Sequence, residues 1–144
     1  MSNKIKLRSV VFCEDVRQEA SGKEILIGVY SDSMLFSQFP TMMRQLVVRI
    51  VADLLDKSVN QATIYLKDEH QTVLNTTTLD LSSQKANEHT LFGAFIQGLT
   101  LYAPGIYSVY LSLDSDPPFK ISDFSARTPQ SDEERRRLQT SPNA

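Results

Sequence analysis

Residues 106–113 read IYSVYLSL and give the clearest indication of the fold. Apolar and polar side chains alternate along this stretch, which is typical of a β-strand with one face turned toward a core. The Pro104-Gly105 turn precedes it, and residues 114–118 form the tip of a hairpin that returns through residues 119–124. The C-terminal third of the chain therefore predicts an antiparallel hairpin.

The same alternation recurs along the chain, with turn-forming residues at intervals of roughly 8–12 residues. Residues 43–55 fit a helical stripe as well as a strand, and their β-branched side chains favour a strand. We expect a short edge strand at residues 78–81 within a polar loop. The other expected strands are residues 4–13, 24–30, 63–67, 72–74 and 90–101. The sequence thus predicts an all-β fold, a single antiparallel β-sandwich of about seven or eight strands, immunoglobulin-like, with a flexible C-terminal tail.

The first expected strand pairs with residues 24–30 as a hairpin whose connection contains Gly22. Side chains at alternate positions of a strand share one face. The inward face of the first strand is expected to hold Ile5, Leu7, Ser9, Val11 and Cys13. Cys13 is then a small buried hydrophobic residue and not a nucleophile.

Residues 128–144 differ from the rest of the chain because they contain no aromatic residue, and we expect the folded domain to end at residue 127. Ser131 and Glu134 match the S-x-x-E capping box that begins many helices. A helix at residues 131–139 is short enough to be marginal on its own in water. These residues therefore predict a flexible tail with a short helix.

The composition excludes several classes of protein. The chain of 144 residues suits one domain, and its 15 basic residues against 17 acidic ones leave no basic excess for binding nucleic acid. One cysteine and two histidines exclude a disulfide framework and a multi-cysteine metal site, so we expect no metal and no cofactor. No stretch reaches the roughly 20 apolar residues of a membrane span, and no signal-peptide pattern is present, so we expect a cytoplasmic protein without a membrane partner.

Glu14, Asp15, Arg17 and Glu19 form the densest charge cluster in the sequence. Paired carboxylates can carry out acid–base catalysis or bind a metal ion. Neighbouring residues of a strand point to opposite faces, so Glu14 and Asp15 converge only if a bulge intervenes. The cluster is either a ligand or partner site or a solvated surface, and we predict no catalytic residue.

A second candidate binding cluster lies in the expected tail, where Arg135, Arg136 and Arg137 follow three acidic residues. This order places negative charge at the start of the helix and positive charge toward its end, as the helix dipole favours.

Two resemblances to known proteins support the fold. The turn Pro104-Gly105 before Tyr107 resembles a corner of immunoglobulin-like sandwiches, in which a tyrosine at the start of a strand fastens the turn. Tyr107 is the candidate for that tyrosine, and Pro104 and Gly105 are its structural neighbours. This resemblance bears on the fold and not on function.

The second resemblance covers roughly residues 8–125 and is to a family of small bacterial proteins of unknown function. It implies a bacterial source and a compact β-sandwich, and it brings no activity with it. The motifs that carry it are FCEDVRQE (12–19), GK (22–23), LIGVY (26–30), FP (39–40) and PGIY (104–107).

From these patterns we expect a non-catalytic protein-interaction module. Its partner is another protein or a second copy of the chain, bound through a sheet edge or loops, with residues 128–144 as a second attachment. One alternative is an enzyme with a carboxylate or metal site near Glu14, Asp15 and Glu19. A further alternative is a structural subunit of a larger assembly.

Overall fold

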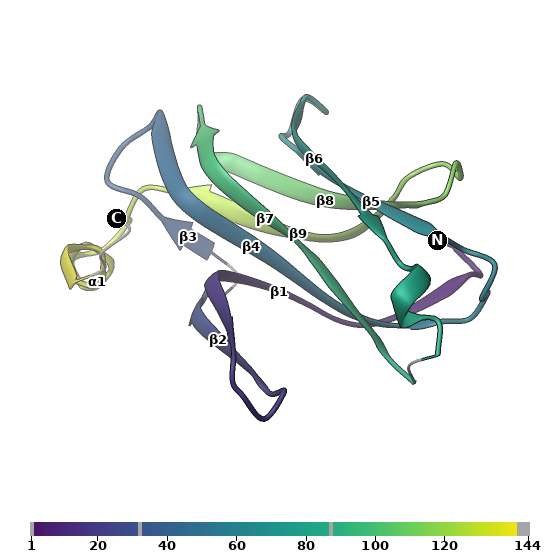
Figure 1. Cartoon of the computed structure of the whole chain (residues 1–144). Helices are drawn as coiled ribbons and strands as arrows, with labels where there is room; N and C mark the ends of the chain where they lie inside the picture. The colour runs from purple at the N-terminus through teal and green to yellow at the C-terminus, as the bar shows by residue number, and fades with distance from the viewer. Residues whose placement is uncertain (1, 32, 87, 141–144) are drawn as a thin grey trace.

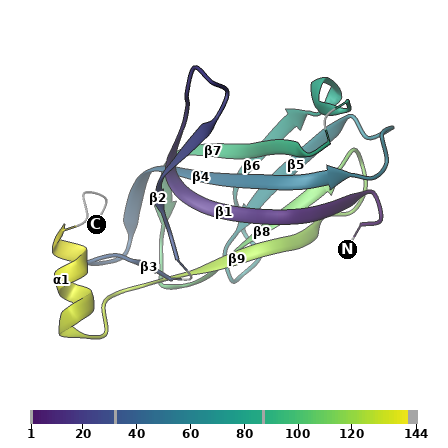
Figure 2. The ribbon, with the colours of Figure 1, turned by 90° about the horizontal axis from the view of Figure 1, so that it is seen from below.

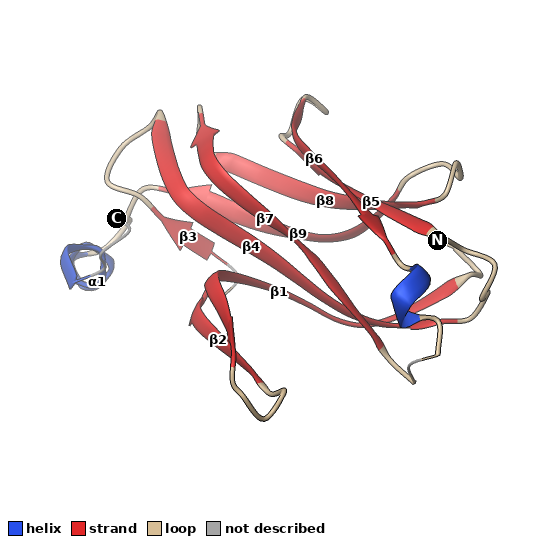
Figure 3. Ribbon diagram, in the orientation of Figure 1, coloured by secondary structure: helices blue, strands red, loops and turns tan. Residues whose placement is uncertain are grey.

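The structure is a computed structural model and describes residues 2–31, 33–86 and 88–140. Strands dominate it, as Figures 1 and 3 show. A single turn of 3₁₀ helix, Ser82–Gln84, precedes β7, and the helix α1 spans Asp132–Thr140. The strands are β1 Ile5–Gln18, β2 Glu24–Val29, β3 Ser33–Leu35, β4 Thr41–Leu54, β5 Gln61–Lys67, β6 Val73–Asp80, β7 Thr90–Leu101, β8 Gly105–Leu113 and β9 Phe119–Arg127.

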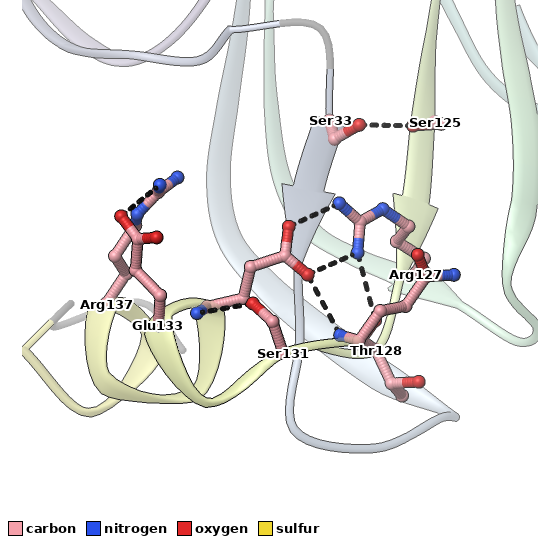
Figure 4. Close-up of polar contacts among 9 residues, drawn as sticks. Ser33, Ser125, Arg127, Thr128, Ser131, Glu133 and Arg137 are labelled. Carbon is pink, nitrogen blue, oxygen red and sulfur yellow. Dashed lines mark hydrogen bonds and ion pairs between the residues drawn. The ribbon is translucent and has the colours of Figure 1, made fainter.

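The strands form two sheets that enclose one hydrophobic core. Sheet A has the strand order β2-β1-β4-β7, and sheet B has the order β3-β9-β8-β5-β6. The pairs are antiparallel except for the short parallel pair of β3 and β9, which Ser33 and Ser125 join through their hydroxyls at 2.9 Å (Figure 4). The predicted all-β sandwich is confirmed, whereas its immunoglobulin-like character stays a prediction.

The described residues form nine strands, and two short segments differ from the prediction. β6 runs without a break from residue 73 to 80, where the sequence predicted two short strands with a loop between them. β6 is an edge strand of sheet B, and one side of it faces solvent. Threonines are therefore tolerated within this strand, and their polarity does not indicate a loop. β3 was not predicted at all, since its three residues are too few to show alternation.

Residues 43–55 form a strand, as their β-branched side chains predicted. β4 lies in the middle of sheet A between β1 and β7. Its consecutive residues Leu46, Val47 and Val48 are all fully buried, so both faces of the strand are covered at this point. A strand buried on both faces needs no polar alternation, which explains why its apolar run also resembled a helix.

In β1, the side chains that face the core are not all the ones that the sequence predicted. The register of β1 against β4 shifts between Leu7 and Ser9, which marks a bulge or irregularity. Ile5 and Leu7 pack toward the core as expected, but beyond the shift Val10 and Phe12 take that face. The expectation that Ser9, Val11 and Cys13 share the core face was therefore wrong, because one irregular position exchanges the two faces of a strand.

An aromatic column connects the two sheets. The ring of Phe12 meets Phe124 of β9 edge to face, with centroids 5.1 Å apart, and Phe124 stacks on Tyr107 of β8 at 5.5 Å. The Tyr107 hydroxyl donates a hydrogen bond of 2.5 Å to the carbonyl of Ala103, four residues upstream in the turn that contains Pro104. The column thus joins β1, β9 and β8 to the turn before β8.

Helix α1 begins one residue later than the predicted span of 131–139. The hydroxyl of Ser131 accepts the backbone N–H of Glu134 at 3.1 Å, which is one half of a capping box. The Glu134 carboxylate does not close the other half: it accepts the N–H of Gln130 and pairs with Arg127 of β9 (Figure 4). An ion pair thus crosses the expected end of the domain at residue 127, and that domain boundary stays a prediction. Residues 141–144 of the expected tail lie outside the described residues.

Replacing Tyr107 with phenylalanine tests the role of the column. Tyr107→Phe removes the hydrogen bond from the buried tyrosine to the Ala103 carbonyl, so the free energy of unfolding should fall by about 0.5–1.5 kcal/mol. Chemical denaturation measures this loss. The control is Tyr102→Phe, since Tyr102 is exposed and should lose nothing measurable. Equal stability of Tyr107→Phe and the natural chain would show that the hydroxyl does not stabilise the corner.

Candidate functional site

The last third of β1 leaves the body of sheet A. β1 pairs with β4 only as far as Cys13, which lies opposite Val47. From Cys13 to Gln18 it pairs with β2 instead, and the two strands form a hairpin that we call the arm (residues 14–29). Figure 2 shows this hairpin rising from the outer side of sheet A, away from sheet B.

A largely buried ion pair ties the arm to the sheet. Arg49 lies opposite Val11 and faces outward from β4. Its Nε donates to Oε1 of Glu24 at 3.0 Å, and its Nη2 contacts the other oxygen of that carboxylate. Both side chains are mostly buried. Since Glu24 lies at the turn end of the arm, this two-point contact holds the arm folded back over the outer face.

Beneath the arm the outer face of sheet A carries a small apolar area. Cys13 and Val47 are fully buried, yet neither belongs to the core between the sheets, which takes their neighbours Phe12 and Val48. They therefore point outward, on the side from which the arm rises. Burial raises the pKa of the Cys13 thiol, which keeps it protonated and unreactive. Cys13 is buried as predicted, but on the opposite face.

Three of the four predicted cluster residues, Glu14, Asp15 and Arg17, line one shallow hollow of about 380 Å³, the β1–β4 hollow. Its other lining residues are Ile27, Arg44, Gln45 and Gln97. Gln45 donates its side-chain amide to the Asp15 carboxylate at 3.1 Å, and Arg17 contacts the same carboxylate at 3.4 Å. The negative charge of Asp15 is thus balanced within the hollow.

Glu14 and Asp15 line the same hollow although they are neighbours in a strand. The Asp15 carboxylate accepts the N–H of the next residue, Val16, at 2.9 Å. The Glu14 side chain lies over Gly28, where an added Cβ would be 2.6 Å from the Glu14 carboxyl carbon. Gly28 has φ +65, so both the space and the backbone conformation suit glycine here.

Glu19 lies outside this hollow, in the turn of the arm, where its carboxylate accepts the hydroxyl of Ser21 at 3.4 Å. Of the three carboxylates that the sequence grouped together, the hollow therefore collects two. No group of three or more His, Cys, Asp or Glu side chains suited to a metal ion occurs among the described residues.

The arginine cluster of the tail lies on α1 and does not line the hollow. Arg135 pairs with Asp132 and Arg137 with Glu133, each at 2.9 Å, as Figure 4 shows for the second pair. Arg136 is exposed. These pairs hold charge within the helix, so the two predicted clusters form no common site.

Sequence reasoning missed the amides of the hollow. Gln45 and Gln97 lie opposite each other in β4 and β7, and Gln97 donates to Gln45 at 3.4 Å. Gln45 follows the charged residue Arg44 in β4, and Gln97 interrupts a mostly apolar stretch of β7, which is the only mark that they leave in the sequence. The register that brings the two amides together depends on how the strands pair in the sheet, so the sequence does not show their contact.

A family model describing a family of unknown function, DUF6941, matches residues 8–122. The chain belongs to this family. The match confirms the resemblance expected from the sequence and covers the arm and the hollow, and it ends before α1. A search among curated proteins found no match. Among the described residues, no helix is long and apolar enough to cross a membrane.

The arm can be tested through the chain's single cysteine. Replacing Arg49 with methionine leaves Glu24 without its cation, which favours opening of the arm. The rate of Cys13 labelling by a thiol reagent should then rise about tenfold. The control is Arg8→Met, which removes the ion pair with Asp53 elsewhere on β1. An unchanged labelling rate in Arg49→Met would show that the ion pair does not hold the arm over Cys13.

The attachment of α1 should depend on pH. The hydrogen bonds from Arg127 and from the N–H of Gln130 lower the pKa of Glu134 from its usual 4.5 to about 2. Because the pKa is lower in the folded state, these contacts stabilise the docked helix fully above pH 4.5 and are lost as the pH falls through about 2. Amide chemical shifts of residues 132–139, followed by NMR from pH 6 to 2, measure this release.

Glu134→Gln should release the helix already at neutral pH, whereas Glu133→Gln, which removes only an exposed pair, should not. A docked helix in Glu134→Gln would contradict this account.

Proposed function

We propose that this protein is a non-catalytic protein-interaction module whose partner adds a β-strand to the free edge of β2. The observation that carries the proposal is the exposure of apolar side chains on this strand. Ile25 is 44% exposed, Leu26 36% and Val29 58%. Because Ile25 and Leu26 are consecutive, they point to opposite faces, so both faces of the arm offer apolar surface to a partner.

The edge of β2 supports strand addition. β2 is the outermost strand of sheet A and, in the part of the chain that the structure describes, pairs only with β1. Its other edge carries backbone N–H and C=O groups that a further strand can bind. Natural proteins protect such edges with lysine or proline, and residues 24–29 contain neither. The one charged residue, Glu24, is occupied by Arg49.

The arm is also held in place before it binds. The contact between Glu24 and Arg49 fixes the turn end of the hairpin, and Gly22 N–H donates to the carbonyl of Glu19 within the turn. A segment that is ordered in advance loses less conformational entropy on binding. This supports a docking role for the arm in preference to that of a loose connection.

The proposal includes the setting and a second contact. We place the module in the bacterial cytoplasm, which the resemblance to small bacterial proteins and a single free, buried cysteine support. Helix α1, with Arg135, Arg136 and Arg137, serves as the second attachment. Another protein is the expected partner, and pairing of β2 with β2 of a second copy is the variant of this function.

Placing a charge on the edge of β2 tests the proposal. Leu26→Lys and Val29→Lys should abolish partner binding, because a lysine on the edge opposes strand pairing, while the fold survives since both positions are exposed. The control is Leu55→Lys, which adds the same charge at a residue that is 59% exposed outside the arm. Quantitative mass spectrometry of proteins retained by the tagged chain compares the variants, beside a chain that ends at Arg127.

The expected result is a protein that the natural chain and Leu55→Lys retain and the two β2 variants lose. Sedimentation equilibrium of the same variants distinguishes a second copy from another protein. If the β2 variants retain the same proteins as the natural chain, the proposal fails. The alternative of an enzyme with a carboxylate or metal site is then favoured. Its test is a thermal-shift screen of metal ions and small molecules with Glu14→Gln as the control.

A further inference from the structure

A groove runs between the free edges of the two sheets, at β6 and β7. β7 ends sheet A and β6 ends sheet B, and the two strands contact each other. The groove between them, the β6–β7 groove, has a volume of about 310 Å³. It is lined by residues 73–75 of β6, residues 96–100 of β7 and Tyr102.

One end of the groove carries exposed apolar surface. Tyr102 is 70% exposed, and Val73 on the opposite wall is also exposed. Leu74 and Tyr102 line a second, smaller hollow of about 130 Å³ as well, so the two depressions are adjacent. An exposed tyrosine near an exposed valine is a common anchor point at protein interfaces.

The smaller hollow adds uncompensated negative charge. Asp68 and Glu69 line it together with His70. Asp68 accepts the N–H groups of His70 and Thr72 at 2.9 Å, and Glu69 accepts the N–H of Ile106 at 2.8 Å. These donors are uncharged, and among the described residues the ion pairs do not include either carboxylate. Two negative charges therefore lie beside the β6–β7 groove.

We propose that the β6–β7 groove binds an extended peptide that carries a lysine or arginine next to an apolar residue. The peptide backbone follows the free edge of β7, its apolar side chain packs against Tyr102 and Leu74, and its cation lies at Asp68 and Glu69. Charge complementarity selects a basic peptide over an acidic one. This site is separate from the β2 edge, so either can fail without the other.

The test uses fluorescently labelled octapeptides of alternating valine and serine whose central serine is replaced by lysine, glutamate or glutamine. Fluorescence anisotropy with the full chain measures each Kd at low and at high salt. The lysine peptide should bind about tenfold more tightly than the glutamate peptide at low salt, and the difference should shrink as salt screens the charges.

Two variants separate the contributions. Tyr102→Ala should weaken binding of all three peptides about tenfold, as loss of an aromatic anchor does. Glu69→Gln keeps an oxygen for the N–H of Ile106 but removes the charge, so it should weaken only the lysine peptide, by about threefold. The matched controls are Leu55→Ala and Glu88→Gln, which alter an exposed apolar residue and an exposed carboxylate outside the groove.

The proposal is overturned if none of the peptides binds, if the lysine and glutamate peptides bind equally, or if Tyr102→Ala has no effect. It is also overturned if the chain dimerises in solution and Tyr102→Ala abolishes the dimer, since a second copy then fills the groove. Leu26→Lys should leave peptide binding unchanged, which keeps this test independent of the β2 edge.

Discussion

Phe12 and Phe124 meet edge to face across the interior, and the arrangement of both sheets depends on this contact. It requires Phe12 to point inward from β1, which is possible only because the register of that strand shifts between Leu7 and Ser9. Phe124 in turn stacks on Tyr107, whose hydroxyl fastens the turn before β8. A packed aromatic column tolerates little displacement. The choice of which face of β1 points inward and the position of β8 therefore depend on each other.

The inward position of Phe12 in β1 also determines which side chains face the outer side of sheet A. With Phe12 inward, Cys13 must face outward, where it pairs with Val47 as buried apolar surface. The arm rises from this place and is held by Glu24 and Arg49. Two surfaces of different chemistry result: an apolar free edge on β2, and a groove between β6 and β7 with acidic groups in the adjacent hollow. In the function that we propose, two separate surfaces join two partners at once, which raises the effective concentration of each for the other.

The strands were the most predictable part of the fold. Alternation in residues 106–113 and β-branched residues in 43–55 were read correctly, because local propensity and burial agree there. The short strand β3 and the continuous strand β6 were missed, since their existence depends on pairing with β9 and β5. Of the candidate site, the grouping of Glu14, Asp15 and Arg17 was visible in the sequence. Their association with Gln45 and Gln97 was not, because the register of β1, β4 and β7 creates it.

The sequence by itself determined the all-β class, the membership of residues 8–122 in their family, the capping residue Ser131 and the burial of Cys13, because each follows from local pattern or residue type. Only the tertiary structure decided which face Cys13 occupies, where the arm lies and which edges stay free. The physical reason is that one irregular position in β1 exchanges its faces without leaving a mark in the hydrophobic pattern. Likewise, a strand is an edge strand because no other strand pairs with one of its sides, and the residues within the strand do not determine this.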